Sequence, residues 1–176
     1  MATDRQKAET VHWHAVFTAS RAEKKVRDRL EELGVECFLP VQTVLRQWTY
    51  RKSRVVVPVI AGLVFVRVSR QEQVKVLQTK GVVAFLRLKG EAGAAVIPDK
   101  QMEDFRFLLD FSEEAVEMTN ENIKAGDLVR VVKGSLRGME GELIRHKGVT
   151  KVLVRIDMLG CAMVNIPASF VEKLNK

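Results

Sequence analysis

The fold is decided by the stretch Gly126-Asp127-Leu128-Val129-Arg130-Val131-Val132-Lys133-Gly134-Ser135-Leu136-Arg137-Gly138-Met139-Glu140-Gly141-Glu142-Leu143-Ile144. Its apolar residues form a short β-prone run on either side of a glycine-rich segment, a pattern typical of a hairpin. The turn glycines are Gly134, Gly138 and Gly141. Glycine tolerates the positive φ angles of a tight, twisted connection, so we predict a left-handed conformation at all three.

The spacing of this stretch resembles the KOW motif, which belongs to small β-barrels of ribosomal proteins and transcription elongation factors. Gly126-Asp127 precedes the strand, and a basic residue stands beside each of the first two turn glycines. Ser135 replaces the proline that often follows the first glycine, a change compatible with a turn. The resemblance implies a KOW domain over residues 123–176. Because its strands are rich in Val and Ile, we expect a permanent β-barrel rather than a helical hairpin.

Composition narrows the class of protein. At 176 residues the chain can form one ordinary domain or two small ones. No apolar run reaches the length of a membrane span, and no signal segment opens the chain, so we expect a cytoplasmic protein with a flexible tail at residues 1–10. Cys37 and Cys161 are far apart in sequence and are predicted to be free thiols in a reducing compartment.

Positive charge is concentrated in the middle of the chain. Between Val41 and Lys89 there are ten Lys or Arg residues and one acid, Glu72, while the whole chain carries a net charge of +7. A concentrated basic field favours contact with a polyanion, either a nucleic acid or an acidic protein surface. The alternative is a set of solvated strand edges that lysine and arginine keep soluble.

The first 110 residues show alternating strand and helix patterns. Two Ser-x-x-Glu capping boxes, at Ser20 and Ser69, predict helix starts, and Pro98-Asp99 predicts a third. The expected order is β-α-β-β-β-α-β-α, an α+β sandwich in which helices cover an antiparallel sheet. Periodicity fades after Phe111, so we predict a domain at residues 11–110, a linker at residues 111–122 and the second domain at residues 123–176.

Taken together, these features resemble the NusG family of bacterial transcription elongation factors, in which an N-terminal NGN domain precedes a KOW barrel. The resemblance lies in the Trp of the first strand, the Ser-x-x-Glu helix, the run Gly62-Leu63-Val64-Phe65-Val66 and the KOW stretch. The segments 38–40, 81–86 and 156–160 are similar to specialised members of the family, RfaH, LoaP and especially the UpxY antiterminators of capsular polysaccharide operons.

This resemblance implies two contacts with RNA polymerase. An apolar depression of the NGN domain docks on the clamp helices, and the start of the second helix meets the opposite pincer of the cleft, so that pausing is disfavoured. The patch 60–66 departs from the family pattern at Ala61 and Leu63, and core packing is the alternative for its apolar residues. The polymerase-binding residues that we predict are Trp13, His14, Ile60, Leu63, Arg70, Gln71 and Gln73.

The resemblance also implies contact with non-template DNA, or with a nascent RNA leader, through the first helix and the turn after the second. The matching residues are Arg21, Lys24, Lys25, Arg29, Thr79, Lys80 and Arg87. In the KOW domain, the matching loop would bind a partner such as a small-subunit ribosomal protein through Met158, Leu159 and Cys161. A packed barrel end is the alternative for this loop.

No catalytic, metal-ligating or nucleotide-binding pattern is present in the sequence. The three histidines and two cysteines do not have the spacing of a metal site, and the glycines do not match a phosphate-binding fingerprint. We therefore expect a monomeric binding protein that is not an enzyme and has no cofactor, no metal and no membrane contact. The expected function is processive antitermination on specific long operons. The alternatives are a general NusG-type elongation and termination factor and a ribosome-associated KOW protein that binds RNA.

Overall fold

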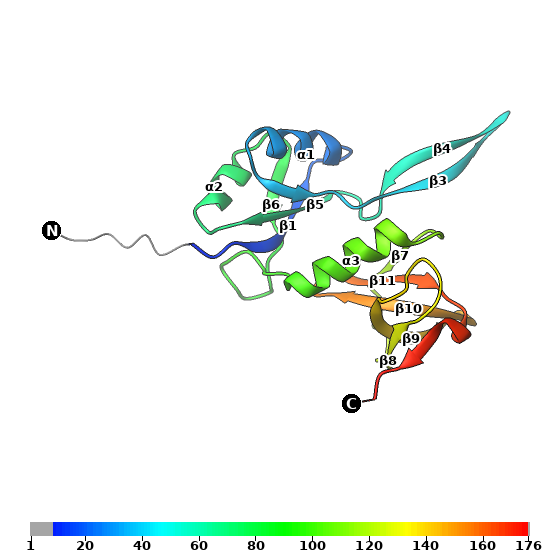
Figure 1. The fold of residues 1–176 in the computed structure, drawn as a ribbon. Coiled ribbons are helices and arrows are strands. Elements are labelled where there is room, and N and C mark those ends of the chain that lie inside the picture. The colour runs from blue at the N-terminus through cyan, green and yellow to red at the C-terminus, as the bar shows by residue number, and fades with distance from the viewer. Residues whose placement is uncertain (1–8, 176) are drawn as a thin grey trace. The chain divides into compact units, whose positions relative to one another are not determined.

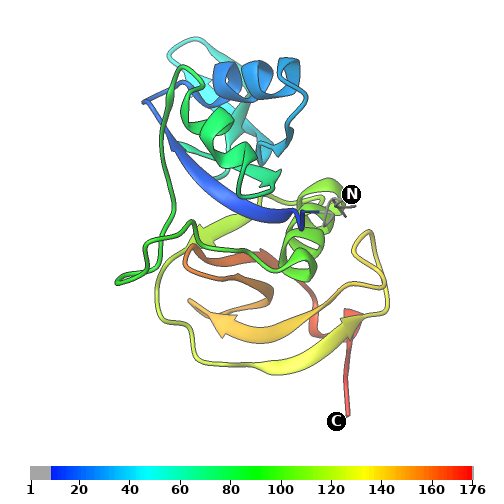
Figure 2. The same cartoon turned by 90° about the vertical axis from the view of Figure 1, so that its left-hand side faces the viewer.

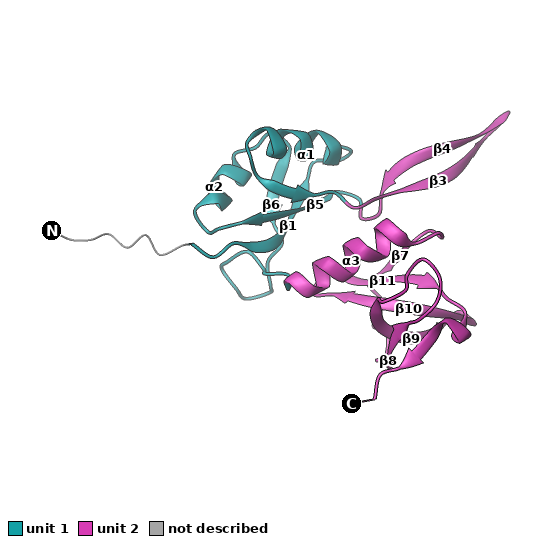
Figure 3. Ribbon diagram, viewed as in Figure 1, with its two compact units in different colours: residues 1–39, 61–98 teal, residues 40–60, 99–176 magenta. Residues whose placement is uncertain are grey.

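The computed structural model describes residues 9–175, and the first eight residues of the predicted tail lie outside that range. Figure 1 shows the course of the chain, and Figure 3 shows its two compact units. Unit 1 comprises residues 1–39 and 61–98, and unit 2 comprises residues 40–60 and 99–176. Each unit is built from two separate stretches of the chain.

Unit 1 is a four-stranded antiparallel sheet with two helices. Strands β1 (His12–Thr18), β2 (Glu36–Phe38), β5 (Leu63–Val68) and β6 (Val82–Phe85) pair in the order β2-β5-β1-β6. The central pair is registered with Ala15 opposite Phe65. Helices α1 (Glu23–Glu32) and α2 (Glu72–Leu77) lie side by side, and the Lys75 ammonium donates to the Leu33 carbonyl (Figures 1 and 2). The most deeply buried side chains of this unit include those of Val16, Val26, Leu30, Val64, Val66 and Val76.

The two predicted capping boxes behave differently. At α2, the Ser69 amide donates to Glu72 Oε2 at 2.8 Å and the Glu72 amide donates to Ser69 Oγ at 3.4 Å, so this prediction is confirmed. At α1 the prediction is wrong, because the helix starts three residues after Ser20 with no side-chain cap. The Glu23 carboxylate instead accepts a bond of 2.7 Å from the Gly62 amide, which ties α1 to the start of β5.

Unit 2 contains a six-stranded antiparallel sheet, a hairpin and one helix. The sheet order is β12-β8-β9-β10-β11-β7, and Figure 2 shows its strong curl. Helix α3 (Asp99–Phe111) lies along β10, and Gln101 Oε1 accepts a bond of 2.8 Å from the Asp157 amide. The strands of the sheet are β7 (Glu117–Thr119), β8 (Asp127–Val131), β9 (Glu140–His146), β10 (Val149–Ile156), β11 (Gly160–Asn165) and β12 (Val171–Lys173), with a 3-10 turn at Ala168–Phe170.

The β3–β4 hairpin forms a separate two-stranded sheet in unit 2. It comprises β3 (Val41–Trp48) and β4 (Arg51–Pro58), joined by a two-residue turn. The sequence pattern predicts a single strand from Cys37 to Trp48, but the structure divides it between β2 and β3. Pro40 stands at the break, where its missing N–H prevents a continuous ladder.

The contact pattern divides the chain differently from the predicted domains. Helix α3, predicted to end the N-terminal domain, is grouped with the six-stranded sheet. The predicted linker, residues 111–122, contains β7, which pairs with β11 through Met118 opposite Ala162. Strand β7 has only three residues, too short for a period-2 pattern to reveal it in sequence.

The turn glycines have two different roles. Gly134 and Gly138 have φ values of +82° and +93°, as predicted. Gly141 is not among the residues with positive φ, so that part of the prediction is wrong. A Cβ at Gly141 would lie 2.9 Å from the Leu153 carbonyl oxygen and from a Val152 methyl group, and the missing side chain therefore permits β9 to pack closely on β10.

Within residues 9–175, no helix combines the length and the apolar content that crossing a membrane requires.

Candidate nucleic-acid and protein interfaces

Unit 1 brings α1 and the turn after α2 together, as the predicted DNA contact requires. Arg29 Nη1 donates to the Lys80 carbonyl at 2.8 Å. Gly81 has a φ of +98°, and a Cβ there would lie 2.8 Å from a Val26 methyl group, so only glycine permits this close approach. Lys25 lies one turn before Arg29 on the same side of α1. The structure therefore places basic groups from two distant segments on one surface.

The remaining predicted DNA residues do not all have free side chains. Thr79 is only 7% exposed and its hydroxyl donates to the Lys75 carbonyl at 3.0 Å, so this residue is corrected from a contact to a buried cap of α2. Arg21, which has a φ of +57°, precedes α1, and Arg87 follows β6. The side chains that remain exposed are those of Arg21, Lys24, Lys25, Lys80 and Arg87.

Three of the residues predicted to form the apolar docking depression are buried. Trp13, His14 and Leu63 are 5%, 3% and 2% exposed, so their predicted surface positions are corrected. His14 Nδ1 is 2.8 Å from the Ala95 carbonyl oxygen, and its ring packs edge-on against Phe85. The physical reason is that successive side chains of β1 and β5 point to opposite faces of the sheet and both faces are covered, so burial along these two inner strands is near-continuous.

Phe17 is an exposed apolar residue of the unit 1 sheet that the sequence patterns did not identify as a contact. It stands directly opposite Leu63 in the β1–β5 register, so the two side chains share one face of the sheet. Its side chain is 41% exposed, while Ile60, the other predicted contact, is half-buried. The signal in the sequence was the alternation of β1, which places Phe17 on the same face as Trp13.

The predicted second polymerase contact lies beside His14. Gln73 Nε2 is 3.4 Å from His14 Nε2, and Arg70 and Gln73 line a cleft of about 570 Å³ together with His12 and His14. Arg70 and Gln71 are exposed, and Gln73 is half-buried. Burial lowers the pKa of His14, although the bond to the Ala95 carbonyl acts in the opposite direction. His14, predicted for the apolar docking contact, therefore lies beside Arg70 and Gln73, which were predicted for the second polymerase contact.

The loop between β10 and β11 carries the predicted partner site of the second domain. Met158 is 37% exposed with a φ of +67°, and Leu159 is half-buried. Cys161 is 3% exposed, so it is corrected from a contact residue to a core residue. Burial raises the pKa of its thiol, and the Arg155 guanidinium lies 3.7 Å from its sulfur. Gly160 stands between the exposed loop and the buried Cys161. A Cβ at Gly160 would lie 2.1 Å from the Thr119 carbonyl oxygen, so only glycine fits at this position.

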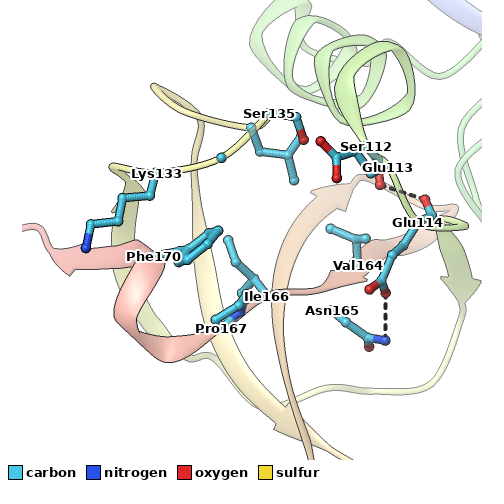
Figure 4. A pocket seen from close by; sticks show the side chains of 12 residues that line it. Ser112, Glu113, Glu114, Lys133, Ser135, Val164, Asn165, Ile166, Pro167 and Phe170 are labelled. Carbon is cyan, nitrogen blue, oxygen red and sulfur yellow. Dashed lines mark hydrogen bonds between the residues drawn. The ribbon is translucent and has the colours of Figure 1, made fainter.

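A pocket of about 240 Å³ lies beside the predicted KOW turn (Figure 4). The Phe170 ring borders it next to Gly134, and Ser112, Glu113 and Glu114 contribute polar groups. Ser112 Oγ donates to the Glu114 carbonyl at 2.6 Å, and Asn165 Nδ2 donates to the Glu114 carboxylate at 2.9 Å. Among the described residues, no group of three His, Cys, Asp or Glu side chains could hold a metal ion.

Comparison with known proteins places these features in a family. The family described as "Transcription termination factor nusG" matches residues 11–106, more than half of the chain. A solved structure described as "Domain interaction in Thermotoga maritima NusG" is 22% identical, covers 94% of this chain and 98% of its own, and aligns with a TM-score of 0.50.

A second solved structure, described as "Crystal Structure of MjSpt4:Spt5 complex conformation B", is 17% identical and covers 93% of this chain and 97% of its own, with a TM-score of 0.31. No curated protein sequence matches the chain significantly. The family match spans all four strands and both helices of unit 1, together with the hairpin and the first half of α3. The chain belongs to the NusG family of transcription factors.

Proposed function

We propose that this protein binds transcribing RNA polymerase and suppresses pausing and termination along specific long operons. The observation that carries the proposal is the family match over residues 11–106. The match includes the whole sheet and both helices of unit 1, which presents an exposed apolar residue and a basic surface. An exposed apolar residue and a basic surface can bind a protein and a nucleic acid. We therefore propose a binding role, without catalysis and without a cofactor.

The polymerase contact is assigned to the face of the unit 1 sheet that carries Phe17. Phe17 offers an aromatic anchor in the register position next to Leu63, and anchors of this kind dominate protein interfaces. Arg70 and Gln71, beside the His14 cleft, are exposed and available for a second, polar contact. Two contacts on opposite sides of a cleft would restrain its opening, which is how binding would reduce pausing.

The nucleic-acid contact is assigned to Lys25, Arg29 and Lys80. Their side chains come from two segments that the Arg29–Lys80 hydrogen bond holds together. Lysine and arginine at such a surface bind phosphates without regard to sequence. The proposed ligand is the exposed non-template DNA strand, or the nascent RNA leader that recruits the protein.

The six-stranded sheet is proposed to be a KOW barrel that recruits a further partner. Its glycine turn has positive φ values at Gly134 and Gly138, two of the three glycines for which the motif predicts them. Met158 is its exposed apolar residue at the β10–β11 loop, and a flexible thioether adapts to varied surfaces. A small-subunit ribosomal protein is the partner that we propose.

The target operons are proposed to be those of the UpxY type, such as capsular polysaccharide operons. This choice depends on the sequence segments 38–40, 81–86 and 156–160. The second candidate function is that of a general factor that favours termination, and the description of the matching family as a termination factor supports it.

A binding measurement tests the shared part of both functions. The cognate polymerase is assembled into elongation complexes, and its affinity for the protein is measured by gel shift. Phe17→Asp is expected to abolish the shift while the variant keeps a native circular dichroism spectrum, because the side chain is already exposed to solvent. Val149→Asp, an exposed apolar position on β10, is the matched control. Unchanged binding by the Phe17 variant would contradict the assigned contact.

A further inference from the structure

The β3–β4 hairpin is an exposed basic ribbon that the proposed contacts do not use. We call residues 41–58 the basic arm. It carries four cations and no acid, namely Arg46, Arg51, Lys52 and Arg54. Among residues 9–175, none of these four side chains forms an ion pair or a hydrogen bond. Unpaired cations at this density attract a polyanion.

The basic arm is fixed at its base and free at its tip. Gln42 Nε2 donates to the Val116 carbonyl at 3.1 Å, and the Val116 amide donates to Gln42 Oε1 at 2.9 Å. Trp48 lies six residues beyond Gln42, about 20 Å further along an extended strand. Figure 3 shows the tip of the arm projecting from the rest of unit 2. Because the base of the arm is held in place and its tip is in solvent, side chains at the tip can contact a binding partner.

Aromatic side chains at the tip lie among the cations. Trp48 is 55% exposed and Tyr50, in the turn, is 98% exposed. Trp48 pairs directly with Arg51, and Arg46 precedes Trp48 by two residues, so these three side chains share one face of the ribbon. The opposite face carries Leu45 paired with Arg54. One face therefore offers a flat π-surface between two guanidinium groups.

We propose that the basic arm binds single-stranded nucleic acid, with an unpaired base stacked on Trp48 and phosphates held by Arg46 and Arg51. Stacking on an aromatic ring tolerates any base, and guanidinium groups neutralise the backbone. An acidic protein surface would satisfy the cations but would leave the indole and the phenol without a flat partner. The inference rests on the proposed role in transcription, where displaced DNA and nascent RNA are the two sources of single strands.

The test measures oligonucleotide binding by the full chain without polymerase. Fluorescence anisotropy is recorded with labelled oligothymidylate, oligouridylate and a DNA duplex of equal length. The single strands are expected to bind more tightly than the duplex. The ratio of the affinities for oligothymidylate and oligouridylate then shows whether DNA or RNA is the preferred ligand. Trp48→Ala is expected to weaken single-strand binding about ten-fold or more. Leu45→Ala, which removes an exposed apolar side chain from the opposite face, is expected to have no effect.

The salt dependence provides a second measurement. Replacing Arg46 and Arg51 with Gln is expected to lower the slope of log affinity against log salt by about 1.4, since each phosphate contact with a single strand contributes about 0.7. Tighter binding to the duplex, or equal binding by Trp48→Ala and the native chain, would overturn the proposal. Polymerase binding by Trp48→Ala is measured in parallel. Its retention, with loss of oligonucleotide binding, separates the arm from the polymerase contact.

Discussion

Glu142 holds three segments of unit 2 together, and replacing it with glutamine tests how that unit is stabilised. Its carboxylate accepts bonds from Arg155 Nε at 2.6 Å and from Arg155 Nη2 at 2.9 Å. It also accepts a bond of 3.0 Å from the Gly126 amide, at the entry to β8. Arg155 Nη2 in turn donates to the Ile123 carbonyl at 3.0 Å. The Glu142 side chain is 17% exposed, so water replaces these bonds poorly.

The size of the effect follows from these bonds. A hydrogen bond to a charged group contributes about 1.5–3 kcal/mol, and a neutral one about 0.5–1.5 kcal/mol. Glu142→Gln keeps the shape of the side chain but removes its charge and replaces one acceptor oxygen with an amide nitrogen that cannot accept. The three bonds together therefore lose roughly 3 kcal/mol. Because the guanidinium of Arg155 can be partly rehydrated, we expect a net loss of about 2 kcal/mol in the free energy of unfolding. For a unit of this size, that loss lowers Tm by about 10 °C.

The effect of Glu142→Gln depends on pH in a defined direction. The Arg155 guanidinium holds the pKa of Glu142 below its usual range, and the Gly126 amide acts in the same direction. The folded-state pKa therefore lies below that of the unfolded chain, about 4.3. The stabilisation by Glu142 is then present at neutral pH and is lost as the pH falls through the folded-state pKa. The difference in Tm between the native chain and the variant should shrink below about pH 4.

Differential scanning calorimetry of the full chain at several pH values measures this effect. The control is Glu140→Gln, which removes the same charge from the same strand but breaks an exposed pair with Arg130. The control variant should lose much less stability than Glu142→Gln. Equal losses in the two variants, or a Glu142→Gln loss that does not change with pH, would contradict the stabilising role assigned to the Glu142 carboxylate.

Three further predictions concern unit 1. Replacing Lys25 and Lys80 with Gln should weaken binding to single-stranded DNA and lower the slope of log affinity against log salt by about 1.4. Lys124→Gln, which removes an exposed cation of unit 2, should change neither quantity, as titrations at several salt concentrations would measure. Burial keeps the pKa of His14 below the unfolded value of about 6.5, so stability should fall as the pH drops below that value, and His14→Asn should remove this part of the pH dependence in thermal melts. Burial raises the pKa of Cys37 to about 11, so its alkylation at pH 7.5 should be far slower than that of a free thiol, as followed by mass spectrometry.

Local patterns in the sequence predicted most of the helices and strands. The Ser69 capping box was readable because both partners lie within one turn of α2. The same pattern at Ser20 failed because Glu23 bonds to the Gly62 amide, a residue far away in sequence that no local rule includes. Strand β7 was missed for a related reason, since its pairing with β11 is a long-range contact of only three residues.

The candidate site was predicted less well than the fold. A contact residue must be exposed to solvent, and the alternation of apolar and polar residues along a strand does not show which of its faces is exposed. Sequence alternation correctly separates the two faces of β1 and β5, but it does not show that Leu63 is buried while Phe17, opposite it, is exposed. In contrast, the resemblance to the NusG family implied that basic residues of α1 and of the turn after α2 act together, and the Arg29–Lys80 hydrogen bond joins those two segments. Charged side chains are rarely buried, so their positions are easier to predict.

If the protein acts as proposed, it changes how transcribing polymerase pauses and terminates. Transcription in vitro by the cognate RNA polymerase, on a template that carries the recruiting leader, pause sites and a terminator, measures this change. We expect shorter pauses and more readthrough when the protein is added, and loss of both effects with Phe17→Asp. Longer pauses or more termination would contradict antitermination and favour the general factor. An unchanged transcript pattern, together with no binding to the elongation complex, would contradict the proposed role in transcription itself.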